Sequence, residues 1–448
     1  MFNAIKTKIS TNLQDKHFSE IFSGSIFSFI TKVLTVGIGL IINLVIAKYY
    51  GADVLGAVAL VLSLLSIATM ISLFGTDVSI LRFIPPLLKK GEQGKVFHIV
   101  RKSMTMIGVL SLGASLLIFL FAPVLAQDIF GKTELMPLIA LAAFFVSFRV
   151  LGNFSLSAIR ALKNIRLYLT LQFLPAIINL TLLGGLTYFF YARYNPVYSL
   201  LASQTFVALL SVWYLHRFVK KHPRHSPGGK GSYREIFSVS YPMFLTASIQ
   251  MVVLQTDTLI LSSMSSMENV GVYSVVTKLA LLSSFVITSI NTIVAPKFSE
   301  LYYTEDIDAL RKIAKKSSKL IFFSTLPISM MLVVFGTELL SMFGDVFTAG
   351  TLALIMLTIG QLVNAMAGSV GYLLNMTGHQ KTLNKIVMLG GVCNVVLNLL
   401  LIPSYGINGA AFASMFSMVL WNLIASYYVN RQFGFYIGYI PLVSRNDR

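Results

Sequence analysis

The feature that most constrains this chain is a series of apolar stretches, each about twenty residues long and separated from the next by a short charged loop. Twenty residues of α-helix extend about 30 Å, the hydrocarbon thickness of a bilayer. A helix also satisfies its own backbone hydrogen bonds, which lipid cannot do. Only 12% of the residues are charged, and the mean hydropathy is +0.77. We therefore predict an all-α integral membrane protein.

The apolar pattern predicts twelve transmembrane helices, arranged as two sets of six. The predicted spans lie near 24–47, 57–81, 103–126, 135–157, 168–191, 197–217, 236–262, 270–293, 317–341, 348–375, 383–403 and 406–430. Ahead of them, Phe2, Ile5, Ile9 and Leu13 fall at helical spacing, so the N-terminal arm either lies on the membrane surface or is a frayed terminus. We expect no cleavable signal peptide, because the first twenty or so residues have no apolar core.

The formal charge of +18 is distributed according to topology. With the N-terminus placed inside, 29 of the 35 Lys and Arg residues fall in inner loops, three in outer loops and three within spans. The Asp and Glu residues are distributed more evenly, with nine in inner loops and six in outer loops. This positive-inside pattern predicts that both termini of a multi-pass membrane protein are cytoplasmic. Because topology accounts for the positive charge, nucleic-acid binding is not expected. The same inner-loop cations would also attract anionic lipid.

The second half of the chain repeats features of the first at an offset of 215 residues. Phe22 corresponds to Phe237, Gly56 to Gly271, and Asn179 to Asn394. Each half has an even number of spans, so the repeats run parallel. The predicted organisation is an arm at 1–23, a first lobe at 24–218, a polar linker at 219–235, a second lobe at 236–431 and a cytoplasmic tail at 432–448.

Three cations interrupt the apolar spans and are candidates for binding an anion. Lys32 lies in the first span, on one helix face with Thr35, Gly39 and Asn43. Arg149 and Lys278 lie in the fourth and eighth spans. A lysine at a helix centre costs roughly 2.5–3.5 kcal/mol on insertion scales. Snorkelling is the alternative for Lys32, which is about 12 Å from its cytoplasmic end.

Uncharged polar residues and one acid form similar lines on corresponding helices of both halves. These candidates for lining a shared central cavity are Asn43, Asn153, Gln250, Asp257, Gln361 and Asn364. In the tenth span, Gln361 and Asn364 continue into Gly368, Gly371 and Asn375 at helical spacing. Helix–helix packing is the alternative role for such lines. Cations, amides and an apolar wall suit an amphiphile that carries phosphate and sugar.

Enzymatic chemistry has little support in this sequence. The segment Gly131–Thr133 reads GKT, but Ala126 stands where a phosphate-binding loop needs glycine. Cys393 is the only cysteine, so neither a disulfide within the chain nor a thiolate metal cluster can form. We expect no catalytic residues, metal or cofactor, and any energy for transport would come from ion or substrate gradients.

Several stretches of the sequence stand out by their order and spacing. In the first half they are "KYYGADVLGAVAL", "FGTDVSILRFIP" and "SAIRALKN". In the second half they are "YPMFLTASIQMVVLQTDTLILS", "NVGVYSVVTKLA", "NMTGHQK" and "NVVLNLLLIPSYGINGAAFASM". Each motif alone is modest in specificity, but jointly they resemble the Wzx-type oligosaccharide flippases of the MOP exporter superfamily. The resemblance covers about residues 20 to 431 and implies a protein of a bacterial cytoplasmic membrane.

The resemblance implies two six-helix lobes in a V-shaped, MATE-like architecture. It also implies transfer of an undecaprenyl-diphosphate-linked oligosaccharide repeat unit to the outer leaflet by alternating access, for O-antigen, capsule or exopolysaccharide synthesis. The implied partners are that lipid-linked glycan, membrane lipid, a proton or sodium gradient, and polysaccharide polymerase or export proteins. A cation-coupled multidrug antiporter of the same superfamily is the alternative, although the in-span acids are only Asp77 and Asp257. A membrane scaffold or glycosyltransferase subunit is a third possibility, disfavoured by loops of only about 20 residues.

Overall fold

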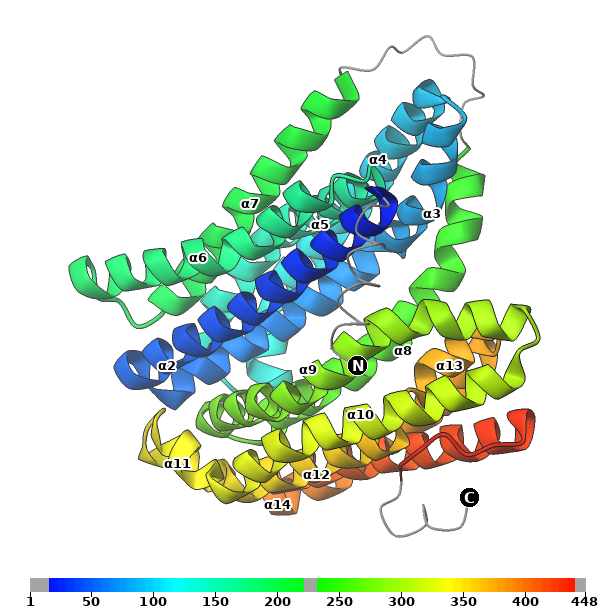
Figure 1. Ribbon diagram of the computed structural model, residues 1–448. Helices are drawn as coiled ribbons and strands as arrows, with labels where there is room; N and C mark the ends of the chain where they lie inside the picture. The colour runs from blue at the N-terminus through cyan, green and yellow to red at the C-terminus, as the bar shows by residue number, and fades with distance from the viewer. Residues whose placement is uncertain (1–15, 221–231, 440–448) are drawn as a thin grey trace. The chain divides into compact units, whose positions relative to one another are not determined.

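The protein is helical throughout the part of the chain that its computed structural model describes, residues 16–220 and 232–439 (Figure 1). No β-strand occurs in these residues. They contain ten helices that are long and apolar enough to cross a membrane. The arm at 1–15, the central part of the linker at 221–231 and the end of the tail at 440–448 lie outside the described residues.

Two of the ten helices are far too long for one crossing, and each contains a break. The segment α2 (Lys16–Leu73) is interrupted at Gly51, with φ 88° and ψ 170°. The segment α14 (Gln380–Phe433) is interrupted at Gly406, with φ 52° and ψ −127°. Both conformations are in the region that glycine adopts without steric cost. When each segment is counted as two passes, the described residues contain twelve helices that could cross a membrane, the number expected from the sequence.

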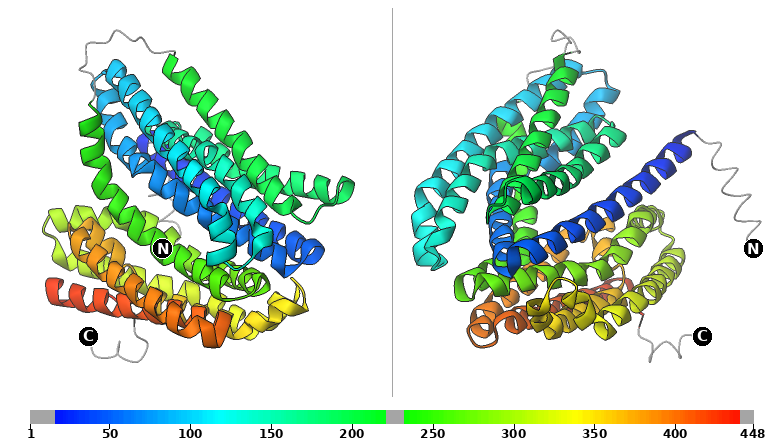
Figure 2. Two further views of the ribbon diagram at one scale, coloured as in Figure 1. Left: turned by 180° about the vertical axis from the view of Figure 1, so that it is seen from behind. Right: turned by 90° about the vertical axis from the view of Figure 1, so that its left-hand side faces the viewer.

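The first of two compact units contains the described parts of Met1–Ile42, Ile71–Phe119 and Leu141–Phe244. Its helices beyond α2 are α3 (Thr76–Lys89), α4 (Gln93–Val124), α5 (Met136–Ala161), α6 (Ile165–Phe189), α7 (Asn195–Lys220) and the start of α8 (Tyr233–Met264). Ile159, Leu171 and Val207 form the apolar contact between α5, α6 and α7. The green helices α6 and α7 run beside each other in both views (Figures 1 and 2).

The second unit contains the described parts of Asn43–Met70, Leu120–Ala140 and Leu245–Arg448. The long helices α9 (Met267–Tyr303), α10 (Ile307–Val334), α12 (Thr351–Ala367) and α14 pack together in it (Figure 1). Its short elements are the π-helix η1 (Leu125–Ile129), the 3₁₀ helices η2 (Thr133–Leu135) and η3 (Asp345–Gly350), and the helices α11 (Gly336–Ser341) and α13 (Val370–Met376). Buried Phe298, Leu310, Leu373 and Val429 belong to its main core.

Three predicted spans are each divided in the structure. The span expected at 57–81 ends at Leu73, because Phe74 and Gly75 adopt positive φ before α3 begins. The span expected at 348–375 is divided into α12 and α13 at Gly368, whose φ is 72°. The span expected at 317–341 is likewise divided into α10 and α11 at Phe335. Apolar periodicity continues through these short turns, so it does not mark them.

Two repeat-related glycines, Gly56 of α2 and Gly271 of α9, lie against each other in the second unit. A Cβ atom on Gly56 would stand 1.9 Å from the carbonyl oxygen of Met267. A Cβ atom on Gly271 would stand 1.9 Å from the carbonyl oxygen of Ala52. Small residues allow helix backbones to approach closely in a membrane, where van der Waals packing drives helix association. The correspondence predicted from the offset is therefore also a physical contact.

Lys132, one of the few cations assigned to an outer loop, fastens that loop to the end of α8. Its Nζ donates to the backbone carbonyls of Ser262 and Ser265, each at 2.7 Å, and to that of Phe130 at 3.3 Å. An ammonium suits a helix C-terminus, where carbonyl groups lack partners and the dipole is negative. Burial lowers the pKa of Lys132 from its usual value, an effect that nearby Glu134 opposes.

Alanine at Gly56 is expected to destabilise the protein, because its methyl group would overlap the Met267 backbone. Overpacking of this kind costs about 1–3 kcal/mol. The measurement is thermal unfolding of the purified protein in detergent. Gly108→Ala in α4 is the control: its Cβ would meet nothing within 4 Å, and alanine is the better helix former. A Gly56→Ala melting temperature at or above that of the parent would contradict the close packing.

Candidate functional site

The most extensive hydrogen-bonded group around a charge in the second unit surrounds Asp257, a residue of α8 that is only 8% exposed. Its Oδ1 accepts from the Nδ2 atoms of Asn398 at 2.7 Å and Asn394 at 3.1 Å. Its Oδ2 accepts from the hydroxyl of Tyr273 at 2.6 Å and from that of Ser414. We call these five residues the Asp257 cluster. They bring together three helices, α8, α9 and α14.

The break in α14 is what allows one segment to supply three members of the Asp257 cluster. Asn394 and Asn398 are four residues apart, so they lie on the same face of the helix before Gly406. Ser414 lies on the helix after Gly406, where the chain has turned back. Tyr273, which is 1% exposed, reaches the carboxylate from α9.

All four partners of Asp257 are neutral donors, which suits an ionised carboxylate. Hydrogen bonds to a charged group each contribute about 1.5–3 kcal/mol, so four can offset much of the desolvation cost. The buried Oδ1 of Asn398 has no hydrogen-bond partner among the described residues. A carboxylate beside an unused amide oxygen offers the oxygen ligands that a small hard cation prefers. The cluster can thus hold a negative charge, a proton or such a cation.

Two residues predicted from different spans, Asn43 and Lys278, meet in the second unit. Lys278 Nζ donates to Asn43 Oδ1 at 2.8 Å, across 235 residues of sequence. Asn43 is 6% exposed and Lys278 is half-buried. Within the described residues, this is the hydrogen bond that the structure gives to the Lys278 ammonium. An ammonium has three donors, so further capacity remains for an anion.

The first unit also contains an intramembrane cation held by an amide. Arg149 of α5 donates from Nη1 to Oε1 of Gln204 on α7, at 3.0 Å. One helix turn away, Gly152 permits the approach, because a Cβ there would lie 2.6 Å from Cβ of Ala208. Gln204 was not among the residues predicted from the sequence. The residues one helix turn before and after it, Leu200 and Ala208, are apolar. Gln204 therefore belonged to no line of polar residues in the sequence.

The remaining candidates occupy varied environments. Lys32 on α2 and Gln250 on α8 are exposed, whereas Asn153 on α5 and Asn364 on α12 are half-buried. Gln361 is 7% exposed, and its Oε1 has no hydrogen-bond partner within the described part of the chain. The continuous polar line predicted for the tenth span does not form, because the helix is interrupted at Gly368.

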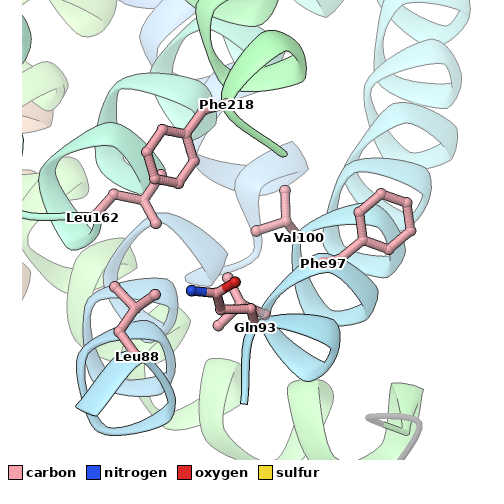
Figure 3. A pocket seen from close by; sticks show the side chains of 7 residues that line it. Leu88, Gln93, Phe97, Val100, Leu162 and Phe218 are labelled. Atoms are coloured by element: carbon pink, nitrogen blue, oxygen red, sulfur yellow. The ribbon is translucent and has the colours of Figure 1, made fainter. Parts of the chain in front are cut away.

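Two cavities in the first unit lie away from all of these candidates. The smaller, about 20 Å³, has room for a single water molecule. Figure 3 shows its lining from the end of α3, α4, the α5–α6 connection and α7: Leu88, Gln93, Val96, Phe97, Val100, Leu162 and Phe218. The larger, about 320 Å³, shares Leu162 and Phe218 with it. No predicted site residue lines either cavity.

The sequence reasoning missed most of the Asp257 cluster. Asn394 was noted only as the repeat counterpart of Asn179. The Asn394–Asn398 pair, four residues apart in an apolar helix, was the available signal. Nothing in the sequence indicated a role for Tyr273 or Ser414, because single hydroxyl groups are common in membrane helices.

The membrane-length helices and the charged groups within them define a multi-pass membrane protein. The family model described as "Polysaccharide biosynthesis protein" matches residues 21–302, and the model described as "MatE" matches residues 242–400. The first match covers more than half of the chain. The protein therefore belongs to the polysaccharide biosynthesis protein family.

Individual relatives are distant but extend over much of the chain. "Stage V sporulation protein B" of Bacillus subtilis (strain 168) is 23% identical over 426 residues, covering 90% of this chain and 82% of the relative. "Capsular polysaccharide biosynthesis protein CapF" of Staphylococcus aureus is 24% identical over 303 residues, covering 62% and 76%. "Probable flippase AglR" of Haloferax volcanii is 27% identical over 172 residues, covering 38% and 36%.

Solved structures share the fold. The "Lipid II flippase MurJ, inward closed conformation" has a TM-score of 0.72 at 16% identity, covering 91% of this chain and 87% of that one. The inward-facing conformation of a multidrug resistance MATE family transporter of the MOP superfamily has a TM-score of 0.73 at 15% identity, covering 90% and 94%. The expected MOP-superfamily fold is thus confirmed.

Tyr273→Phe is expected to lower the free energy of unfolding by about 1–3 kcal/mol, because it removes one donor from a buried carboxylate. Asp257→Asn should have a cost of similar size. The double variant should lose at least about 1 kcal/mol less free energy of unfolding than the sum of the losses in the two single variants. The reason is that each single change already removes the same Tyr273–Asp257 hydrogen bond. Thermal and denaturant unfolding in detergent measure this coupling, with exposed Tyr427→Phe as the control. Strict additivity would contradict the cluster.

Proposed function

We propose that this protein is a flippase that moves an undecaprenyl-diphosphate-linked oligosaccharide repeat unit from the inner to the outer leaflet of a bacterial cytoplasmic membrane. The observation that carries the proposal is a family match combined with an amide-held cation within the membrane spans of each unit. Both termini face the cytoplasm, and the glycan serves O-antigen, capsule or exopolysaccharide synthesis. The relatives' names agree with this class of cargo.

In this proposal, Lys278 of the second unit and Arg149 of the first each offer, within their own unit, a positive group for phosphate. Guanidinium presents a planar fork to phosphate oxygens, and ammonium acts as a point charge with three donors. The neutral acceptors Gln204 and Asn43 orient both cations without cancelling their charge. Lys32 supplies an additional positive charge, while Asn153, Gln250, Gln361 and Asn364 bind sugar hydroxyls. The polyprenyl tail stays in lipid, which avoids the cost of moving it through a polar region.

Alternating access requires two orientations that interconvert, and net transport in one direction requires a source of free energy such as an ion gradient. We propose that a proton or sodium gradient acts through Asp257. Protonation or cation binding there changes the charge at a buried carboxylate that four donors now satisfy. Polysaccharide polymerase or export proteins would receive the product on the outer side.

A cation-coupled multidrug antiporter is the second candidate, and the Asp257 cluster is the observation that favours it. A buried carboxylate can bind a proton or a cationic drug, and the MatE match at 242–400 spans Asp257, Asn394 and Asn398. The intramembrane cations Lys278 and Arg149 count against this candidate, because they would repel a cationic cargo.

The proposed function predicts that deleting the gene causes a complete diphosphate-linked repeat unit to accumulate, with loss of surface polymer. Mass spectrometry of extracted polyprenyl lipids and staining of surface glycan measure both effects in the same cells. Lys278→Met in the restored gene should reduce glycan export at least tenfold, because methionine retains the apolar stem but cannot bind phosphate.

The control for Lys278→Met is Lys297→Met, on the same helix. Lys297 is exposed and pairs with Glu300 at 2.6 Å, a surface contact of little energetic weight. Export should then be normal. Unchanged lipids together with a new sensitivity to organic cations would favour the antiporter instead. Normal glycan export by the Lys278→Met variant would contradict the role of Lys278 in binding phosphate. The flippase proposal itself would still be tested by the lipids that accumulate in the deletion strain.

Asp257→Asn is expected to make transport insensitive to an imposed proton or sodium gradient, because the side chain no longer changes charge. The measurement is flipping of a fluorescent lipid-linked oligosaccharide in proteoliposomes, with each gradient applied separately. Exposed Asp345→Asn in the same unit is the control and should respond as the parent does. A full gradient response in Asp257→Asn would exclude this residue as the coupling group.

A further inference from the structure

The larger cavity of the first unit is lined by residues that have no role in the proposed transport. It encloses about 320 Å³, within the range of about 300–1,000 Å³ for small-molecule sites. It lies between the end of α5, the start of α6 and the end of α7. The lining residues are Ile159, Leu162, Asn164, Leu167, Trp213, Tyr214, Arg217 and Phe218. The lining therefore combines apolar side chains with an arginine, an amide and two amphipathic aromatic rings.

The polar lining residues of this cavity are organised by local contacts. The guanidinium of Arg217 lies over the Trp213 ring, 5.3 Å from its centroid and one turn away on α7. Asn164 caps α6, its Oδ1 accepting from the backbone N–H of Leu167 at 3.3 Å. The start of a 25-residue helix adds the positive end of its dipole. An arginine stacked on a ring loses less side-chain entropy when it binds a further partner.

The chain segment that lines the cavity carries charge of one sign. The hundred residues 135–234 contain no Asp or Glu, whereas they contain eleven Lys and Arg. Three of these cations are exposed and immediately adjoin lining residues: Arg160 at the end of α5, Lys163 in the connection and Arg166 at the start of α6. Arg160 also lies over an aromatic ring, that of Tyr168, at 5.5 Å. No carboxylate of this segment can neutralise the cations.

We propose that this cavity binds the headgroup of an anionic phospholipid of the inner leaflet. Arg217 and the start of α6 bind the phosphate, Asn164 and Trp213 contact the polar headgroup, and the first acyl carbons lie on Ile159, Leu162 and Phe218. Basic pockets between transmembrane helices on the cytoplasmic side bind anionic headgroups for the same reasons. The charge distribution of the loops assigns this end of α5, α6 and α7 to that side.

The lipid occupies a place distinct from the proposed transport residues of the same unit. None of the candidate cavity residues lines the pocket, and Arg149 with Gln204 lies more than two helix turns from Arg160 along α5 and from Trp213 along α7. Trp213, Tyr214 and Phe218 are each more than a third exposed, so the pocket opens toward the surroundings. We assign the site to a resident phospholipid that anchors α6 and α7, and not to the cargo.

The chain contains its own reporter for this lipid. Trp213 and Trp421 are the only two tryptophans, so Trp421→Phe leaves Trp213 as the sole emitter, inside the proposed site. The full chain with that change is reconstituted in phosphatidylcholine, and brominated phosphatidylglycerol or brominated phosphatidylcholine is titrated in. Brominated phosphatidylglycerol should quench Trp213 with about fivefold higher affinity, the effect of one cation near the surface.

Arg217→Gln should reduce that preference to near parity, because it removes the charge that binds phosphate. Arg193→Gln is the matched control: Arg193 lies over the Tyr194 ring at 5.5 Å, in the loop at the opposite ends of α6 and α7. It should leave the preference unchanged. Each affinity ratio compares the two brominated lipids in the same variant. A change in the fluorescence intensity of Trp213 between variants therefore cancels.

Three outcomes would overturn the proposal. Equal quenching by the two brominated lipids in the parent would show that the site does not select an anionic headgroup. A preference retained in Arg217→Gln would exclude this arginine as the phosphate ligand. Displacement of brominated phosphatidylglycerol by a polyprenyl diphosphate, at a tenfold lower mole fraction than by unbrominated phosphatidylglycerol, would assign the site to the cargo.

Discussion

Every backbone polar group within hydrocarbon must find its partner inside the protein, and the rest of this structure depends on that constraint. It excludes strands with open edges, so the spans are helices. It also limits where a helix can stop, because four N–H groups at its start and four carbonyls at its end lose their partners. The positive φ angles at Gly51 and Gly406 turn the chain between crossings. Lys132 donates to two carbonyls at the end of α8, those of Ser262 and Ser265.

The same constraint explains how charges are arranged within the spans. An isolated charge in a bilayer is costly, and pairing a lysine directly with an aspartate would remove both charges from use. This protein instead holds each charge with neutral groups. Asp257 has amide and hydroxyl donors, Lys278 has an amide oxygen, and Arg149 has the amide oxygen of Gln204. A neutral partner stabilises a charge without cancelling it.

The sequence predicted the fold more completely than the site. Apolar length and loop charge are local properties, so twelve crossings could be counted before any contact was known. The break at Gly368 was missed because the apolar residues continue through it. Lys278 and Asn43 were each predicted, yet nothing in the sequence indicated that they touch across 235 residues. Gln204, Tyr273 and Ser414 act through partners on other helices, and such pairings are set by tertiary packing.

The repeat shows which features duplication preserved and which diverged. Gly56 and Gly271 are both retained, since each allows the other's backbone to approach. Across the same 215-residue offset, Asp257 corresponds to Ile42, Tyr273 to Val58 and Asn398 to Leu183.

Asn394 does have a counterpart in Asn179, but the Oδ1 of Asn179 is buried without a hydrogen-bond partner among the described residues. The first half therefore lacks the carboxylate around which the cluster is built, while its Arg149 corresponds to Asn364 in the second half. The two halves thus share Gly56 and Gly271 at this offset, but their charged residues differ. In the proposed coupling role, the single carboxylate of the Asp257 cluster would carry one monovalent charge in each transport cycle.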